Sequence, residues 1–327
     1  MNEHAKALRD FLLRRYYKSA ALGWSVPRSL HWAKIVNNQG RWRWIRSHLG
    51  IRGRLLRNPP THIYQTVCRF KTDTPPRGYR STGYFLGGPL IFDLDAIAKH
   101  EPISLWRIID TAAMVRDLQE MLQDRGEFRA VRVLFSGLRG IHVLVEEDRE
   151  DFEPIRIDSE SRRNWAIVEY IRERYQVARS IGKWCQGWDW QVSADIWRVS
   201  RVPWSIHGSS ALRAIPLEQP YACSSFRDQL RAASPFSLER RFRIRTIRPV
   251  PLFTFINGES YGPFRKGWAT KLPLAVALHL IWLGLAKPRE KGPSQVGAWF
   301  DKGWQLFFRS GASSNGMAAS MESLTAT

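Results

Sequence analysis

The sequence has few cysteines, and the three that it has lie far apart. They are Cys68, Cys185 and Cys223, so no C-x-x-C pair is present. Zinc ribbons and disulfide frameworks require such closely spaced cysteines. We therefore expect no zinc cluster and no disulfide-stabilised fold, and this cysteine usage is typical of a reducing cytoplasm.

A long apolar run is also missing. The longest one, residues 272–286, is interrupted by Pro273 and His279 and falls short of the roughly 20 residues needed to span a bilayer. The N-terminal stretch is charged and contains no apolar signal region. These features predict a cytoplasmic protein with no membrane partner, in which residues 272–286 form a buried helix.

Acidic residues are scarce relative to basic ones. The 327 residues include 50 Lys and Arg but only 30 Asp and Glu, which gives a formal charge of +20 and a pI near 10.5. Such a field attracts polyanions and gains free energy from counterion release. A membrane surface would also be attracted, but nucleic acid is the favoured partner, with a nucleoid-associated location. The 44% apolar content indicates a folded chain with a substantial core.

Hydrophobic periodicity predicts a chain of mixed helices and strands. Helices are expected over 4–22, 104–124, 161–181 and 272–286, strands over 63–70, 89–95, 131–135 and 141–145, and a basic, β-like stretch over 237–248. The apolar residues of the third helix are Trp165, Val168, Ile171 and Tyr175, and Arg174 is assigned to its exposed basic face.

Residues 24–60 are rich in Trp, Arg and Gly, and they include the alternating segment 41–46. Aromatic and basic residues in alternation can stack on bases and pair with phosphates. The tryptophans could equally face a core while the arginines face water. The sequence leaves both alternatives open.

Two carboxylates alternate with apolar residues in the segment 90–95. On a strand, Asp93 and Asp95 share one face, about 7 Å apart, while Phe92 and Leu94 share the other. Neighbouring anions repel each other unless a cation lies between them, and Mg²⁺ prefers oxygen ligands of this kind. Alone, the pair also fits an ordinary solvent-facing strand.

Two further segments carry polar side chains suited to anions. Residues 136–142 place Ser136, Arg139 and His142 around a tight turn with two glycines, whose backbone can approach an anion closely. Residues 189–207 add another carboxylate, more arginines and a histidine near Ser205. A glycine-rich turn by itself is weak evidence, because most such turns have no ligand.

Taken in order, these motifs resemble the catalytic small subunit of archaeal and eukaryotic DNA primase. They read hydrophobic-Asp-hydrophobic-Asp, Ser-Gly-x-Arg-Gly-x-His, Asp-x-x-Val-Ser and Arg-x-Pro-x-Ser-x-His. The resemblance extends over roughly residues 60–213, and 11–17 are similar to the opening Arg- and Tyr-rich helix of that family.

The resemblance implies a two-metal site and a triphosphate site. Asp93, Asp95 and Asp189 would hold two Mg²⁺ or Mn²⁺ ions, with Asp195 as a rival for the third carboxylate unless it pairs with Arg198 or Arg201. The incoming nucleotide would be bound by Ser136, Arg139, His142, Arg201, Ser205 and His207. Many relatives have a second arginine where Leu138 stands, and many carry a zinc cluster that three dispersed cysteines cannot supply.

The resemblance further implies an α/β (α+β) fold, a primase-type core with a mixed sheet flanked by helices. We expect this core over 1–248, a small helical C-terminal element over 249–309 and a disordered tail over 310–327. The implied activity is synthesis of short RNA or DNA primers on single-stranded DNA from nucleoside triphosphates, with a primase large subunit or a helicase as a further partner.

Three alternatives remain from the sequence. The first is a repair or end-extending polymerase of the same superfamily, and the second is a non-catalytic single-strand-binding protein. The third is a metal-dependent nuclease, which is less favoured because it has little use for residues that bind a triphosphate.

Overall fold

The computed structural model describes most of the chain up to Arg289. The described residues are 3–19, 32–37, 40–46, 58–72, 74–75, 82–98, 101–125, 128–147, 152–157, 165–182, 190–218 and 223–289. Asp189, the tail 310–327 and much of the tryptophan-rich stretch 24–60 therefore lie outside the description. Within these ranges, no helix is both long and apolar enough to cross a membrane.

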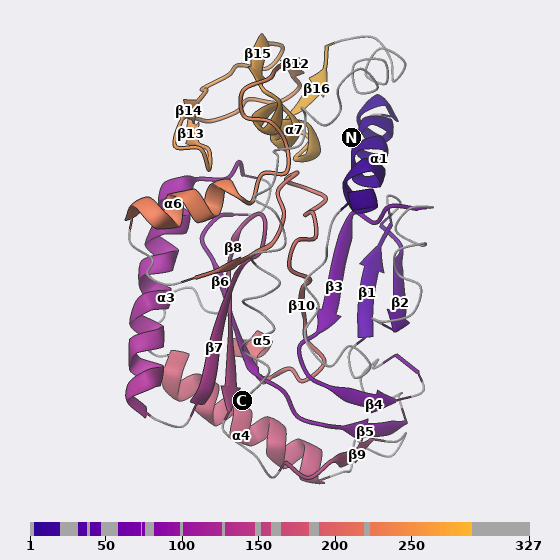
Figure 1. The fold of residues 1–327 in the computed structure, drawn as a ribbon, viewed down its shortest axis with the longest axis vertical. Helices are drawn as coiled ribbons and strands as arrows, with labels where there is room; N and C mark the ends of the chain where they lie inside the picture. Colours follow the sequence, from indigo (N-terminus) through magenta and orange to yellow (C-terminus); the bar gives the residue numbers. More distant parts are fainter. Residues whose placement is uncertain are drawn as a thin grey trace.

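The central sheet has four strands in the order β11-β7-β8-β6, and every pairing in it is antiparallel. The strands are β6 (Leu90–Asp95), β7 (Phe128–Phe135), β8 (Gly140–Glu147) and β11 (Ile215–Leu217). Phe92 and Leu94 are fully buried on the face that packs on α3 (Leu105–Arg125) (Figure 1). Strand alternation leaves Asp93 and Asp95 on the opposite face.

Helix α3 has the apolar stripe that its sequence predicts. Leu105, Ile108, Val115 and Leu122 are completely buried, because residues three and four apart lie on one helical face. The strand at 89–95 and the hairpin around residues 137–140 are likewise confirmed, with boundaries shifted by a few residues.

A second four-stranded sheet lies beside the first, in the order β10-β3-β1-β2 (Figure 1). Its strands are β1 (Trp32–Val36), β2 (Trp42–Arg46), β3 (His62–Thr66) and β10 (Val199–Arg201), and helix α1 (Glu3–Ser19) contributes to the same core. The hydroxyl of Tyr17 accepts a hydrogen bond from the Ile206 N–H (3.2 Å), and that of Tyr16 donates to the Trp204 carbonyl (2.5 Å). These bonds tie α1 to the loop after β10.

A smaller sheet has the order β4-β5-β9, and α4 packs against it. The elements here are β4 (Phe70–Thr72), β5 (Gly83–Phe85), β9 (Ile155–Ile157), α4 (Trp165–Gly182) and the short α5 (Trp190–Ala194). The predicted apolar face of α4 was only partly right, because Ile171 packs against the core but the centre of the buried face is shifted. Among the α4 side chains whose burial is described, the buried ones are Ile167, Tyr170, Arg174 and Ala178, whereas Trp165 is 76% exposed.

The C-terminal part of the description contains more strand than we predicted. Helix α6 (Cys223–Arg231) leads to β12 (Arg241–Thr246), β13 (Phe253–Thr254), β14 (Ser260–Tyr261), β15 (Ala269–Pro273), α7 (Leu274–Trp282) and β16 (Ala286–Pro288). The order β15-β12-β16 makes a three-stranded sheet, and α7, whose residues are all buried, packs on one side of it. The expected buried helix is confirmed, but the element around it is α+β and not simply helical.

The predicted α/β class is confirmed, and the character of its sheets is corrected. Every strand pairing in the described residues is antiparallel, whereas a mixed sheet was expected. The reason lies in the order β7-β8-β6. Strands β6 and β7 run in the same direction around α3, but the hairpin strand β8 is inserted between them and is antiparallel to both.

Candidate active site

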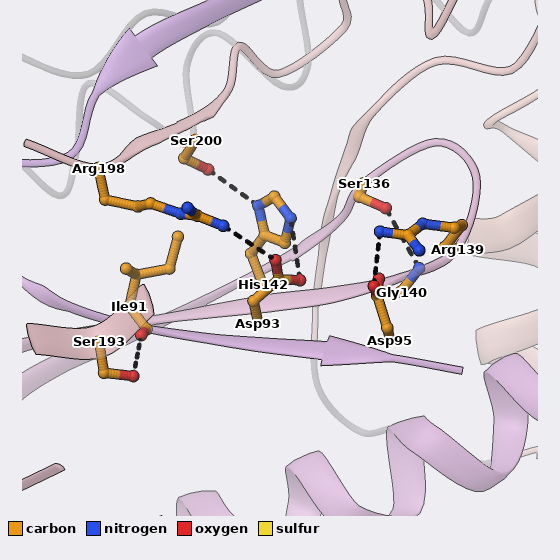
Figure 2. A network of polar contacts seen from close by, with 10 residues as sticks. All are labelled: Ile91, Asp93, Asp95, Ser136, Arg139, Gly140, His142, Ser193, Arg198 and Ser200. Carbon is orange, nitrogen blue, oxygen red and sulfur yellow. Dashed lines mark hydrogen bonds and ion pairs between the residues drawn. The ribbon is translucent and has the colours of Figure 1, made fainter. Parts of the chain in front are cut away.

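The two carboxylates of β6 face the hairpin strand β8. Asp93 lies opposite His142, and Asp95 lies opposite Gly140. Strand β6 is fixed on its other side by α5, where the Ser193 hydroxyl donates to the Ile91 carbonyl at 2.5 Å (Figure 2). Both carboxylates thus lie on a rigid, doubly supported strand and remain accessible to solvent, with 22% and 38% of their side chains exposed.

The turn between β7 and β8 brings a guanidinium onto the second carboxylate. The turn is closed by two hydrogen bonds, from the Ser136 N–H to the Gly140 carbonyl (2.9 Å) and from the Gly140 N–H to the Ser136 hydroxyl (3.2 Å). Arg139 then reaches Asp95, with 2.6 Å between Nη2 and Oδ2 (Figure 2). A Cβ on Gly140 would lie 2.0 Å from the Leu94 carbonyl oxygen, so only glycine permits this close pairing of β6 and β8.

His142 lies between the first carboxylate and β10. Its Nε2 is 3.5 Å from Asp93 Oδ1, and its Nδ1 is 3.1 Å from the Ser200 hydroxyl (Figure 2). Burial lowers the pKa of His142; Asp93 opposes this shift, and the positive charges of Arg201 and Arg198 add to it. A neutral imidazole whose Nδ1 accepts from Ser200 presents its Nε2–H toward the carboxylate.

Two residues of this network were not among the predicted site residues. Arg198 approaches Asp93, with 4.0 Å from Nη2 to Oδ2, and Ser200 holds the ring of His142. The signal available in the sequence was the spacing of 198 and 200, two residues apart at the start of a short strand and just before the predicted Arg201.

Arg201 and His207 form a second cluster, together with two side chains of β3. Arg201 is 2% exposed, its Nη1 is 3.0 Å from His62 Nδ1, and it lies over the ring of Tyr64 at 4.8 Å. The rings of His62 and His207 meet edge to face at 4.8 Å. Burial, with the charges of Arg201 and Arg9, lowers the pKa of His62 to about 2, so its Nδ1 acts as an acceptor.

The two clusters are joined through the loop after β10. The Ser210 hydroxyl donates to the Gly137 carbonyl at 2.5 Å, and His207 Cβ lies against Gly137. Burial, followed by the charges of Arg201, His62 and Arg139, holds the pKa of His207 well below its usual value. The predicted residues from the two later motifs therefore converge on one turn. Ser205 is completely buried, and its hydroxyl points to the Ile63 carbonyl (3.4 Å).

The described residues do not decide between Asp189 and Asp195 as the predicted third carboxylate. Asp189 lies outside them, and Asp195 accepts a hydrogen bond from the Trp197 N–H at 2.9 Å instead of forming the expected ion pair with an arginine. No group of three or more His, Cys, Asp and Glu side chains in the described residues could hold a metal ion. Asp93 and Asp95 fit a divalent cation as two hard oxygen donors on one face, but they form only part of a ligand set.

The tryptophans described in the stretch 24–60 differ in exposure, and whether they stack on bases stays a prediction. Trp32 is buried, with its Nε1–H donating to the Thr72 hydroxyl (3.2 Å). Trp42 is 53% exposed, Lys34 Nζ lies 3.7 Å from its ring centre, and Tyr64 lies 5.9 Å away. Tyr64 also lies against the buried Arg201, so the ring beside Trp42 contacts the second cluster.

Fold and site together define an α/β protein in which an antiparallel sheet presents two carboxylates to a shell of arginine, histidine and serine. Comparison with known proteins gives the particular relationship. The chain is 25% identical over 253 residues to the DNA primase small subunit of Sulfolobus acidocaldarius, covering 63% of this chain and 74% of the relative. It is 26% identical over 266 residues to that of Pyrobaculum islandicum, covering 69% and 80%. The small subunit of Archaeoglobus fulgidus is 24% identical over 239 residues, covering 57% and 70%. The chain is therefore similar in sequence to the archaeal DNA primase small subunits, which confirms the resemblance seen in its motifs.

Two further comparisons complete this result. No family model matches the sequence. Among solved structures, the chain is similar to the polymerase domain of Mycobacterium tuberculosis ligase D in complex with DNA, with a TM-score of 0.34 and 16% identity, covering 66% of this chain and 79% of that one.

Proposed function

We propose that this chain is a DNA primase or primase-polymerase, which makes short RNA or DNA primers on single-stranded DNA by template-directed nucleotidyl transfer. The observation that carries the proposal is the register of β6 with β8, which sets Asp93 against His142 and Asp95 beside Arg139. The similarity to archaeal primase small subunits supports the same activity. A primase large subunit or a helicase is part of this proposal as a partner.

The carboxylates have the role of metal ligands in this proposal. Asp93 and Asp95, with Asp189 as the third carboxylate, would hold two Mg²⁺ or Mn²⁺ ions. When bound, such ions activate the attacking hydroxyl and neutralise charge on the leaving pyrophosphate. In the described structure Arg139 and Arg198 balance the two carboxylates, and both guanidiniums would be released toward a triphosphate once cations replace them.

The remaining polar side chains would bind and orient the triphosphate. Neutral His142 can donate from Nε2 to a phosphate oxygen, while Ser200 fixes its tautomer and ring orientation. Arg201 has a buried Nε–H with no acceptor among the described residues, a donor that an anionic oxygen would satisfy. Ser136 and His207 would complete this shell from the turn and the following loop. Ser205, which is buried, would act by holding the Arg201–His207 loop on β3.

The template would pass over the exposed part of the second sheet in this proposal. Trp42 and Tyr64 offer ring faces, and Lys34 offers a charge beside them. Such platforms bind unpaired bases with little sequence preference.

Primer synthesis on single-stranded DNA tests the proposal, with labelled ribo- or deoxyribonucleotides and either Mg²⁺ or Mn²⁺. Asp93→Asn/Asp95→Asn should abolish synthesis, because it removes two charges that the metals need, and should retain DNA binding. The matched control, Asp110→Asn/Asp117→Asn, removes two carboxylates from exposed positions of α3 and should keep full synthesis.

The outcomes separate the candidate functions. Products that depend on Asp93 and Asp95 support a two-metal polymerase, and the preferred nucleotide distinguishes a primase from an end-extending polymerase. Tight single-strand binding by the wild type without any product, even with a template-bound primer, would contradict a stand-alone polymerase and favour a binding protein. Metal-dependent degradation of the template would indicate a nuclease.

A further inference from the structure

The three-stranded sheet β15-β12-β16 has one face made of basic side chains. Strand β12 alternates strictly, with Arg241, Arg243 and Arg245 exposed and the intervening residues buried. The buried side chains pack into the core that includes α7, so the arginines point away from it. The sheet is at the end of the molecule next to α7 in Figure 1.

The neighbouring strands extend this basic face on both sides. Lys271 of β15 lies directly opposite Arg243, and Lys287 of β16 lies directly opposite Arg245. Residues paired across antiparallel strands point to the same face, with Cβ atoms about 5 Å apart. Both lysines are exposed. We call these five residues, Arg241, Arg243, Arg245, Lys271 and Lys287, the basic sheet face.

The fold does not neutralise this charge. No ion pair in the described residues involves any member of the basic sheet face, and residues 237–289 contain only two acidic residues, Glu239 and Glu259, against ten lysines and arginines. The helix α3 shows the opposite pattern, since Arg107 lies 3.0 Å from Glu101 and Arg116 lies 2.9 Å from Asp117. Like charges directly opposite each other destabilise a sheet, so solubility alone does not account for two such pairs.

An exposed aromatic ring lies at the end of the same sheet. Trp268 is 55% exposed and directly precedes β15. Its carbonyl accepts a hydrogen bond from the N–H of Thr246, the residue after Arg245, at 2.9 Å. In the strand register Trp268 aligns with Thr246 and not with the arginines, so the part of the sheet that can follow a phosphate backbone is the row of cations, which repeats about every 7 Å along β12.

We propose that the basic sheet face binds the sugar-phosphate backbone of single-stranded DNA, at a place separate from the carboxylate site. The contacts are made by charge to phosphates, so the binding is independent of sequence and strongly dependent on salt. This surface would hold a strand whether or not the carboxylate site catalyses nucleotidyl transfer, and it therefore does not rest on the proposed function.

The test is the salt dependence of binding to a fluorescently labelled oligothymidine, measured by anisotropy without metal or nucleotide. Arg241→Gln/Arg243→Gln/Arg245→Gln should lower the slope of log K against log salt by about 2, because each lost phosphate contact on a single strand contributes about 0.7. The control, Arg116→Gln/Arg172→Gln/Arg179→Gln, removes the same charge from α3 and α4 and should leave the slope unchanged.

Thermal unfolding shows whether the variant is folded. Removing three like charges relieves repulsion across the sheet, so the melting temperature of the triple variant should equal or exceed that of the wild type. The single variant Arg243→Gln provides a second measure, with an expected slope change of about 0.7.

Several results would overturn the proposal. Equal slopes for the triple variant and the wild type would do so, as would an equal loss in the control, which would indicate a general charge effect. Binding to vesicles of phosphatidylserine that is lost in the triple variant, with DNA binding unchanged, would assign the surface to a membrane. Asp93→Asn/Asp95→Asn should retain the wild-type slope, so that a failure of catalysis and a failure of this surface are distinguished.

Discussion

His279 lies in the middle of α7, where its side chain is completely buried and both ring nitrogens are hydrogen bonded. Nε2 accepts from the Ile103 N–H at 3.0 Å, and Nδ1–H donates to the Ser210 carbonyl at 2.8 Å. Burial lowers the pKa of His279 to about 4, against which the bond to Ser210 acts only in part. A second ring proton would have to lie on Nε2, where it would meet the Ile103 N–H.

The direction and size of the acid effect follow from this shift. Between pH 6.5 and 4, His279 is protonated in the unfolded chain but stays neutral in the folded chain. The contribution of neutral His279 to stability is therefore complete above pH 6.5 and falls as the pH is lowered. The loss is about 1.4 kcal/mol per pH unit, which gives about 3 kcal/mol over the whole interval.

The variant His279→Gln isolates this effect, because glutamine keeps a donor and an acceptor but does not titrate. We expect it to cost about 1–2 kcal/mol near pH 7.5 from imperfect hydrogen bonds. Urea unfolding between pH 7.5 and 4.5 should then show a shallower pH dependence than in the wild type, by up to one proton. Other histidines titrate in both proteins and cancel in the difference. The reasoning is refuted if both proteins lose stability with the same pH dependence.

Three further substitutions test other parts of the structure. Gly140→Ala forces a Cβ against the backbone of β6 and should cost about 3 kcal/mol in urea unfolding and suppress primer synthesis; unchanged stability would contradict the register. Arg174→Met removes three hydrogen bonds from a charged donor, to the Gly88 and Pro89 carbonyls and the Tyr170 hydroxyl, and should cost about 3 kcal/mol, whereas exposed Arg172→Met should change stability by less than about 0.5 kcal/mol. Trp42→Ala should weaken single-strand binding in anisotropy by about 1–3 kcal/mol, and exposed Trp165→Ala should not; equal effects would remove the stacking role.

Local periodicity was sufficient to predict an element and its buried face where the segment has only one way to bury its apolar residues. Strand β6 alternates, so the sequence assigned Asp93 and Asp95 to one face and Phe92 to the other. The glycines at 137 and 140 marked the hairpin turn, which is closed by backbone and hydroxyl bonds within five residues.

Local periodicity failed where two helical faces carry similar side chains. In α4 the predicted stripe through Val168 and the observed one through Ile167 both advance in steps of three or four residues, as one face of a helix does. The choice between them depends on Arg174, whose guanidinium donates to the Gly88 and Pro89 carbonyls at 2.8 and 2.7 Å. Those acceptors are more than 80 residues away in sequence, so the pattern within α4 assigned a buried arginine to the surface.

By itself, the sequence determined the elements that local spacing encodes: the carboxylate strand, the glycine turn, α3, and the order of motifs that resembles the primase small subunits. Tertiary structure alone decided which side chains meet. His142 lies between Asp93 and Ser200, and Arg201 joins His62, because β8 is inserted beside β6 and β10 pairs with β3. The same is true of the basic sheet face, since Lys271 and Lys287 join the arginines of β12 only through strand register. Such contacts depend on the packing of segments far apart in the chain. The free energy of that packing cannot be inferred from local sequence periodicity.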